Sequence, residues 1–198
     1  MGESKVNLAT LIGSRICHDL ISPVGAITNG LELLEMSGLQ PGPEMDLIAD
    51  SVGNAAARIR FFRIAYGVAG EQDLSADEVS NLLADLTGSG RVRVDWTVQG
   101  SAPRAEVRLA FLALQCCESA MPLGGNVRME RQDGAWSIAG MADIIAVEPT
   151  LWEGLSRPGA IEKVTPAQVQ FALLPAVAAD MGRRIGVSAR DTAVTITF

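Results

Sequence analysis

Apolar side chains recur every three to four positions along the first third of the chain, which is the spacing of one face of an α-helix. The stripe runs from Val6 to about Glu35 and consists of Leu8, Ile12, Ile16, Leu20, Ile27, Leu31 and Leu34. Helix-breaking residues at 37–43 interrupt it, and a second helical pattern follows from about Glu44 to Tyr66. Two long helices joined by a short turn predict an antiparallel hairpin within residues 1–70.

The apolar stripe of such a hairpin has no partner inside the same chain, because two helices alone cannot enclose a core. A second hairpin from another copy would cover it and complete a four-helix bundle. We therefore expect a homodimer.

Beyond a glycine-containing linker at 67–73, the periodic segments become shorter, and alternating segments appear among the helical ones. Alternating apolar and polar positions predict strands at 91–99, 127–131, 136–142, 184–189 and 192–198, with a turn at 132–134. Longer-period segments predict helices at 76–86, 103–121 and 166–181, the last kinked at Pro175. Residues 71–198 therefore predict a second, α/β domain with helices packed on one face of a mixed sheet.

Composition narrows the classes of partner. The chain has 198 residues, 48% of them hydrophobic, and a net charge of −7, which argues against nucleic acid or an anionic membrane surface as the main partner. No apolar run reaches the ~18–20 residues of a membrane span. Three cysteines, two of them adjacent at Cys116 and Cys117, favour buried thiols in a reducing, cytoplasmic compartment.

His18 is the only histidine, and it lies within the first predicted helix, followed by Asp19 and Pro23. A neutral imidazole is a good nucleophile near pH 7, so His18 is a candidate phosphoryl carrier. At 100° per residue it points away from the apolar stripe. The residues on the same face are mostly small or polar: Leu11, Ser14, Ser22, Gly25 and Asn29. Leu11 and Ile21 flank this face as apolar residues. On composition alone, a surface or capping histidine without chemistry is the favoured interpretation of His18.

The segment His18-Asp19-Leu20-Ile21-Ser22-Pro23-Val24 resembles the H-box of sensor histidine kinases. In those proteins the motif lies on the first helix of a dimeric four-helix bundle, and an ATP-binding α/β domain follows it. The resemblance therefore implies a histidine-kinase-like (Bergerat-type) α/β sandwich after the hairpin.

The second domain departs from the kinases where they bind ATP. Residues 108–125 resemble the kinase helix that carries an Mg²⁺-binding Asn, but Cys116 stands at that position, and a thiol is a poor Mg²⁺ ligand. Residues 140–147 contain Asp143 but no glycine after it, so they lack the glycines of a phosphate-binding turn. No glycine-rich lid precedes Pro166. Gly124 and Gly125 are more typical of a helix-to-strand turn. This combination resembles the histidine phosphotransferases of the ChpT type.

That resemblance implies a relay without use of ATP. His18 would take a phosphoryl group from an Asp on the receiver domain of a hybrid kinase and pass it to an Asp on a response regulator. The chain itself would bind no cofactor, and the receiver would bring the Mg²⁺. Asp19 would orient the imidazole or assist proton removal, unless it is only a solvated carboxylate.

The expected docking surface spans both helices. On the first helix it comprises Leu11, Ser14, Arg15, Ile21, Ser22 and Gly25. Counting past the turn places Arg60 to Ile64 opposite His18, where Arg60 and Arg63 are candidates to stabilise a phosphoryl group, or are merely solvated.

Other functions stay open on the sequence. One is a non-catalytic dimeric scaffold or inhibitor of a sensor kinase, in which His18 is incidental. Another is an ATP-dependent histidine kinase with an unusual nucleotide site. A small-molecule enzyme is the weakest, because the α/β half has no histidine and no nucleophile elbow.

Overall fold

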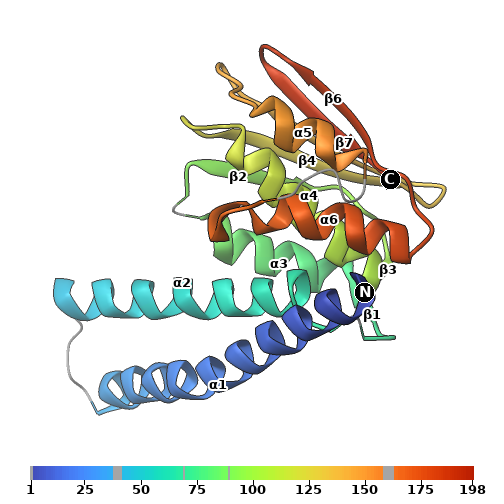
Figure 1. The fold of residues 1–198 in the computed structure, drawn as a ribbon. Coiled ribbons are helices and arrows are strands. Elements are labelled where there is room, and N and C mark those ends of the chain that lie inside the picture. The colour runs from blue at the N-terminus through green and yellow to red at the C-terminus, as the bar shows by residue number, and fades with distance from the viewer. Residues whose placement is uncertain (1, 38–41, 69, 89, 158–162) are drawn as a thin grey trace. The chain divides into compact units, whose positions relative to one another are not determined.

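The computed structural model describes residues 2–37, 42–68, 70–88, 90–157 and 163–198, with the side chains of residues 2–12, 14 and 35 outside that description. The chain divides into two compact units, Met1–Val68 and Ala69–Phe198 (Figure 1). Within the described ranges, no helix has both the length and the apolar character needed to cross a membrane.

The first unit is a hairpin of two helices, α1 (Gly2–Met36) and α2 (Pro43–Ala65), as the spacing of apolar residues predicts. Gly42 caps α2 in an extended conformation, and Pro43 begins the helix, where its missing N–H costs no hydrogen bond. Glu44 and Asp46 occupy the first turn, where the helix dipole favours negative charge.

The two helices approach closely near the start of the hairpin. A Cβ atom added to Gly13 would lie 3.4 Å from both the Cβ and the carbonyl oxygen of Tyr66. Farther along, α1 runs through Pro23, which has no N–H to donate to the carbonyl of Asp19. Helix α1 therefore lacks one backbone hydrogen bond in the turn just after His18.

The second unit contains a five-stranded mixed sheet of order β2-β4-β5-β7-β6. Its strands are β2 (Val92–Trp96), β4 (Gly125–Gln132), β5 (Ala135–Met141), β6 (Gly186–Arg190) and β7 (Ala193–Thr197). Only the β2–β4 pair is parallel. A separate two-stranded sheet joins β1 (Asp73–Ser75) to β3 (Ser101–Pro103).

Helices α3 (Ala76–Thr87) and α4 (Arg104–Ser119) pack on one face of this sheet, and α6 (Val169–Asp180) packs against α4 (Figure 1). Strand residues facing them alternate with exposed ones, so Met129, Ile138 and Ile196 are buried in one row across β4, β5 and β7. Helix α4 is buried along most of its length and forms the centre of the core. The prediction of helices packed on one face of a mixed sheet is confirmed.

Several boundaries differ from the prediction. Helix α6 begins at Val169, after a 3₁₀ turn at Pro166–Gln168, and it continues through Pro175. Strand β2 ends at Trp96 rather than at residue 99. The sequence did not reveal β1, β3 or the helix α5 (Pro149–Leu155), because three-residue strands and a seven-residue helix are too short to show a period.

The turn predicted at 132–134 is confirmed. Asp133 and Gly134 both have positive φ angles, 50° and 80°, as a two-residue hairpin turn with the right twist requires. The three tryptophans pack within the α/β unit, as expected. Trp136 and Trp152 are buried, and the ring of Trp96 lies 5.6 Å from that of Trp136.

Candidate functional site

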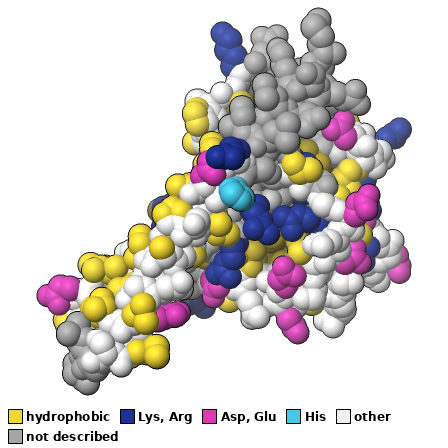
Figure 2. Space-filling model, turned by 90° about the horizontal axis from the view of Figure 1, so that it is seen from below, with side chains coloured by type: hydrophobic (Ala, Val, Ile, Leu, Met, Phe, Trp, Pro, Cys, Tyr) yellow, Lys and Arg dark blue, Asp and Glu magenta, His cyan; other side chains and the backbone are white. Residues whose placement is uncertain are grey.

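The only histidine of the chain is exposed on α1. The side chain of His18 is 81% accessible, and Figure 2 shows its imidazole at the surface of the molecule. The imidazole ring is therefore open to solvent on α1.

His18 belongs to a short chain of polar contacts with Asp19 and Arg15. The Nδ1 atom of His18 lies 3.2 Å from Oδ1 of Asp19. Arg15, one turn earlier, donates from Nε to Oδ2 of the same carboxylate at 2.8 Å. The hydrogen bond with His18, followed by the interaction with Arg15, holds the pKa of Asp19 below its ordinary value. Asp19 is therefore an anion at neutral pH.

The C-terminal part of α2 runs beside this turn of α1. Cys17, next to His18, is buried, and burial raises the pKa of its thiol while the positive charge of Arg63 opposes the rise. Arg63 thus lies near Cys17, and Tyr66 lies against Gly13 one turn away. Both Arg60 and Arg63 are exposed residues that make further interactions of their own.

The other predicted docking residues lie on the same turns of α1. Arg15 and Ser22 are exposed, and Ile21 and Gly25 are half-buried. A Cβ added to Gly25 would meet no atom within 4 Å, so packing within the chain does not require glycine there. Leu11 and Ser14 also belong to α1, but their side chains lie outside the described residues.

The opposite side of α1 is apolar and uncovered. Four residues on this apolar face are between 44% and 54% exposed: Ile16, Leu20, Ile27 and Leu34. They lie about 160–200° around the helix from His18, at 100° per residue. Helix α1 thus presents two different surfaces to solvent, a polar one around His18 and an apolar one behind it.

In the second unit, the position predicted to replace a metal-binding Asn is sealed in the core. Cys116 is fully buried, and burial raises its pKa well above the ordinary value. Burial likewise raises the pKa of Cys117 to about 12. All three cysteines are free and buried, as the sequence predicts. These thiols are packing groups and not reactive ones at neutral pH.

Gly124 and Gly125 form a turn, as predicted, with their N–H groups already used. Gly124 donates to the carbonyl of Met121 at 3.0 Å, and Gly125 donates to that of Arg91 at 3.2 Å. Gly124 has φ of 92°, and a side chain there would overlap the backbone of Arg91. Neither amide is free to bind a phosphate.

A buried ionic cluster in the second unit was not predicted. Glu106 of α4 accepts hydrogen bonds from Arg131 Nε at 2.9 Å, Trp136 Nε1 at 2.8 Å and Arg183 Nη2 at 2.6 Å. Arg183 also donates to the carbonyl of Gly134 at 2.6 Å. The cluster joins α4 to β4, β5 and the segment before β6. A glutamate within an apolar helix was the only hint of it in the sequence.

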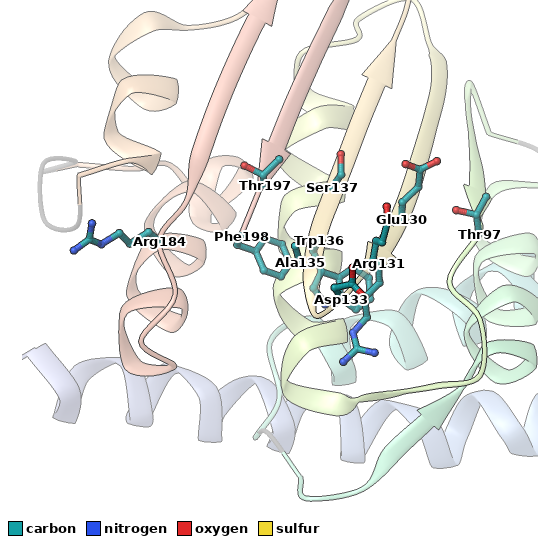
Figure 3. Close-up of a pocket in the computed structure, with 11 residues that line it drawn as sticks. Thr97, Glu130, Arg131, Asp133, Ala135, Trp136, Ser137, Arg184, Thr197 and Phe198 are labelled. Carbon is teal, nitrogen blue, oxygen red and sulfur yellow. The ribbon is translucent and has the colours of Figure 1, made fainter.

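A hollow in the second unit lies by the β4–β5 turn (Figure 3). It measures about 860 Å³ and is lined by hydroxyls from Thr97, Ser137 and Thr197 above the rings of Trp136 and Phe198. Its Arg131 is already bound to Glu106. Among the described residues, no three of His, Cys, Asp or Glu gather in a way that could hold a metal ion.

Comparisons with known proteins agree on one family. The model for the histidine phosphotransferase C-terminal domain matches residues 76–193. The protein phosphotransferase ChpT of Brucella abortus (strain 2308) is 35% identical over 202 residues, covering 98% of this chain and 95% of that protein. A solved structure of a bacterial phosphotransferase, determined at 1.7 Å, matches with a TM-score of 0.67 and 29% identity, covering 98% and 95% of the two chains.

Proposed function

Because this chain belongs to the histidine phosphotransferase family, we propose that His18 carries a phosphoryl group between aspartates of two receiver domains in a two-component phosphorelay. The donor would be the receiver of a hybrid histidine kinase, and the acceptor would be a response regulator. The observation that carries this proposal is the exposed imidazole of His18, the only one in the chain, beside an ionised Asp19.

The transfer needs little from this chain beyond a nucleophile and a docking surface, because phosphoryl transfer depends mainly on positioning and charge stabilisation. The lone pair of the neutral imidazole attacks the phosphorus of an aspartyl phosphate. A nitrogen–phosphorus bond forms while the phosphorus–oxygen bond breaks, and the donor carboxylate leaves with the electron pair. A second receiver then reverses these steps with its own aspartate.

The receivers would supply the Mg²⁺ for both steps, since oxygen ligands on the receiver suit that ion. Arg60 and Arg63 on α2 are proposed to stabilise the charge of the phosphoryl group, because α2 runs beside the turn of His18. The receiver would contact Leu11, Ser14, Arg15, Ile21, Ser22 and Gly25 on α1.

We propose that the relay does not use ATP. The buried Cys116 offers no hard ligand for a nucleotide-bound Mg²⁺, and the amides of Gly124 and Gly125 are occupied within the fold. Cys116 is therefore used for packing, and the Gly124–Gly125 turn for backbone hydrogen bonds within the α/β unit.

We propose that the protein acts as a homodimer. The apolar face of α1 lies on the opposite side of the helix from His18, so a second hairpin can cover it and leave the imidazole accessible. The result is a four-helix bundle with two outward-facing histidines.

The test is label transfer to the purified protein. We expect acid-labile label to arrive from a phosphorylated receiver domain with Mg²⁺ and to leave again when a second, unlabelled receiver is added. Labelled ATP alone, in parallel, should give none. Label from ATP alone would identify a kinase, and stable receiver binding without any label would identify a scaffold.

A further inference from the structure

We infer that Arg15 is a positioning residue for His18, holding the Asp19 carboxylate so that the imidazole keeps its hydrogen on Nδ1 and reacts through Nε2. This inference rests on the proposed function and deepens it. It gives Arg15 a second role, in addition to the contact with the receiver that is proposed above.

The geometry of the helix explains why an anchor is needed. Residues at i and i+1 do not face each other on an α-helix, so His18 and Asp19 meet only if Asp19 leans toward the ring. Residues at i and i+4 do face each other, and Arg15 stands four positions before Asp19. Its Nε binds Oδ2 at 2.8 Å, which leaves Oδ1 at 3.2 Å from Nδ1 of His18.

The two contacts divide the carboxylate between two partners. A free carboxylate rotates about its last bond and samples water on both oxygens, whereas one anchored at Oδ2 presents Oδ1 in a fixed direction. The hydrogen bond with His18, followed by the interaction with Arg15, lowers the pKa of Asp19, and the carboxylate is an anion at neutral pH. A charged carboxylate can only accept, so Nδ1 must be the donor.

The tautomer decides which nitrogen reacts. With the hydrogen on Nδ1, the lone pair is on Nε2, the nitrogen farther from the backbone. When Nε2 bonds to phosphorus, the ring retains its Nδ1 hydrogen and acquires positive charge, which faces the anionic Asp19. Arg15 is therefore placed to affect the reaction without touching the phosphoryl group.

The single histidine allows a direct test of the tautomer. In nitrogen-15 labelled protein, at a pH where the ring is neutral, the imidazole correlation spectrum contains one residue and shows which nitrogen carries hydrogen. We expect Nδ1–H to predominate in the wild type, Arg15→Gln to shift the population toward Nε2–H, and Arg15→Lys to restore much of the difference.

Arg58→Gln is the matched control. Arg58 makes the same type of contact on α2, donating from Nε to Oδ1 of Asn54 at 2.8 Å across four residues. Its removal changes the charge of the hairpin equally and leaves Asp19 untouched. We expect no change in the tautomer of His18.

A second readout uses phosphoramidate, a small phosphoryl donor that needs no docking surface. We expect Arg15→Gln to slow labelling of His18 by about tenfold and to lose selectivity for Nε2, with recovery in Arg15→Lys and no effect of Arg58→Gln. The ring nitrogen that carries the phosphate is identified by its coupling to phosphorus.

The inference is overturned if Arg15→Gln leaves both the tautomer and the phosphoramidate rate unchanged. If only transfer from a receiver slows, Arg15 acts in docking alone and the inference is again wrong, while the proposed function stands. If the wild type accepts label from phosphoramidate but from no receiver, the proposed function fails, and the tautomer measurements still decide the role of Arg15.

Discussion

The hairpin and the α/β unit treat their polar and apolar groups in opposite ways. In the α/β unit the charged Glu106 is buried with three donors, and Cys116 and Cys117 are sealed in the core. In the hairpin His18 is exposed, and so are apolar residues such as Ile27. The first arrangement completes a fold by itself. The second leaves the candidate nucleophile and apolar side chains exposed to solvent.

The comparison teaches where to look for chemistry in this chain. The α/β unit has the larger core, yet Cys116, which stands where the kinases carry an Mg²⁺-binding Asn, is buried within that core. The hairpin buries fewer side chains. Its candidate nucleophile, His18, and its exposed apolar residues face solvent on opposite sides of one helix. The following predictions test that division, beginning with the largest expected effect.

Replacing the nucleophile should abolish function without damage to the fold. His18→Gln is expected to accept no label from a receiver or from phosphoramidate, because no other imidazole exists in the chain. Its stability should change by no more than about 0.5 kcal/mol, since the side chain is exposed. The measurements are label transfer and urea unfolding. Residual acid-labile label on this variant would place the phosphoryl carrier elsewhere.

Placing a charge on the apolar face of α1 should separate the proposed dimer. We expect Ile27→Asp to weaken self-association about 100-fold or more, because two carboxylates would lose water at the seam. Sedimentation equilibrium measures the change. Asn29→Asp is the control, as it adds the same charge on the side of His18. A dimer of undiminished strength in Ile27→Asp would show that this face is not the interface.

Neutralising the buried cluster should destabilise the α/β unit. Glu106→Gln leaves Arg131 and Arg183 without their anion, and we expect a loss of about 3 kcal/mol in the free energy of unfolding. Glu130→Gln breaks only the exposed pair with Arg128 and should cost under about 1 kcal/mol.

The readout for these two variants is denaturant unfolding, combined with phosphoramidate labelling at low denaturant. We expect Glu106→Gln to label His18 at the wild-type rate while the unit stays folded. A slower rate under those conditions would contradict the separation of stability in one unit from chemistry in the other.

Restoring the kinase-like residue should cost stability and yield no nucleotide site. Cys116→Asn buries an amide in an apolar position, which we expect to cost about 2 kcal/mol in urea unfolding, whereas Cys116→Ser should cost less. Neither variant should bind labelled ATP, because the amides of Gly124 and Gly125 remain bonded within the turn. Nucleotide binding by Cys116→Asn would mean that this turn rearranges easily.

Long helices and strands with a clear period were predictable from the sequence. The short strands and the ionic cluster around Glu106 were not. The spacing of apolar residues gave both helices of the hairpin and the strands of the sheet to within a few residues. The strands β1 and β3 arise because residues about 28 positions apart pair, such as Leu74 with Ala102, and a three-residue segment carries no local signal of that pairing. The ionic cluster joins residues up to 77 positions apart, which no local pattern encodes.

The same limit applies to the site. His18, Asp19 and Pro23 stand out along the sequence because they are close together in it. The contact of Arg15 with Asp19 was open to inference from the i, i+4 spacing, yet the sequence alone favoured a docking role for Arg15. Whether Arg15 positions His18 depends on the orientation of the Asp19 carboxylate, and the residues around a side chain in space decide its orientation.

The sequence by itself determined the helical hairpin, the mixed α/β unit, the single candidate nucleophile and the departures from the kinase pattern at Cys116 and in residues 140–147. These follow from local periods, from the identity of single residues and from the absence of others. The tertiary structure decided which groups are sealed and which are available. Burial of Cys116, use of the glycine amides and the anchoring of Asp19 by Arg15 all depend on atoms brought together by folding, which is where hydrogen bonds and packing are settled.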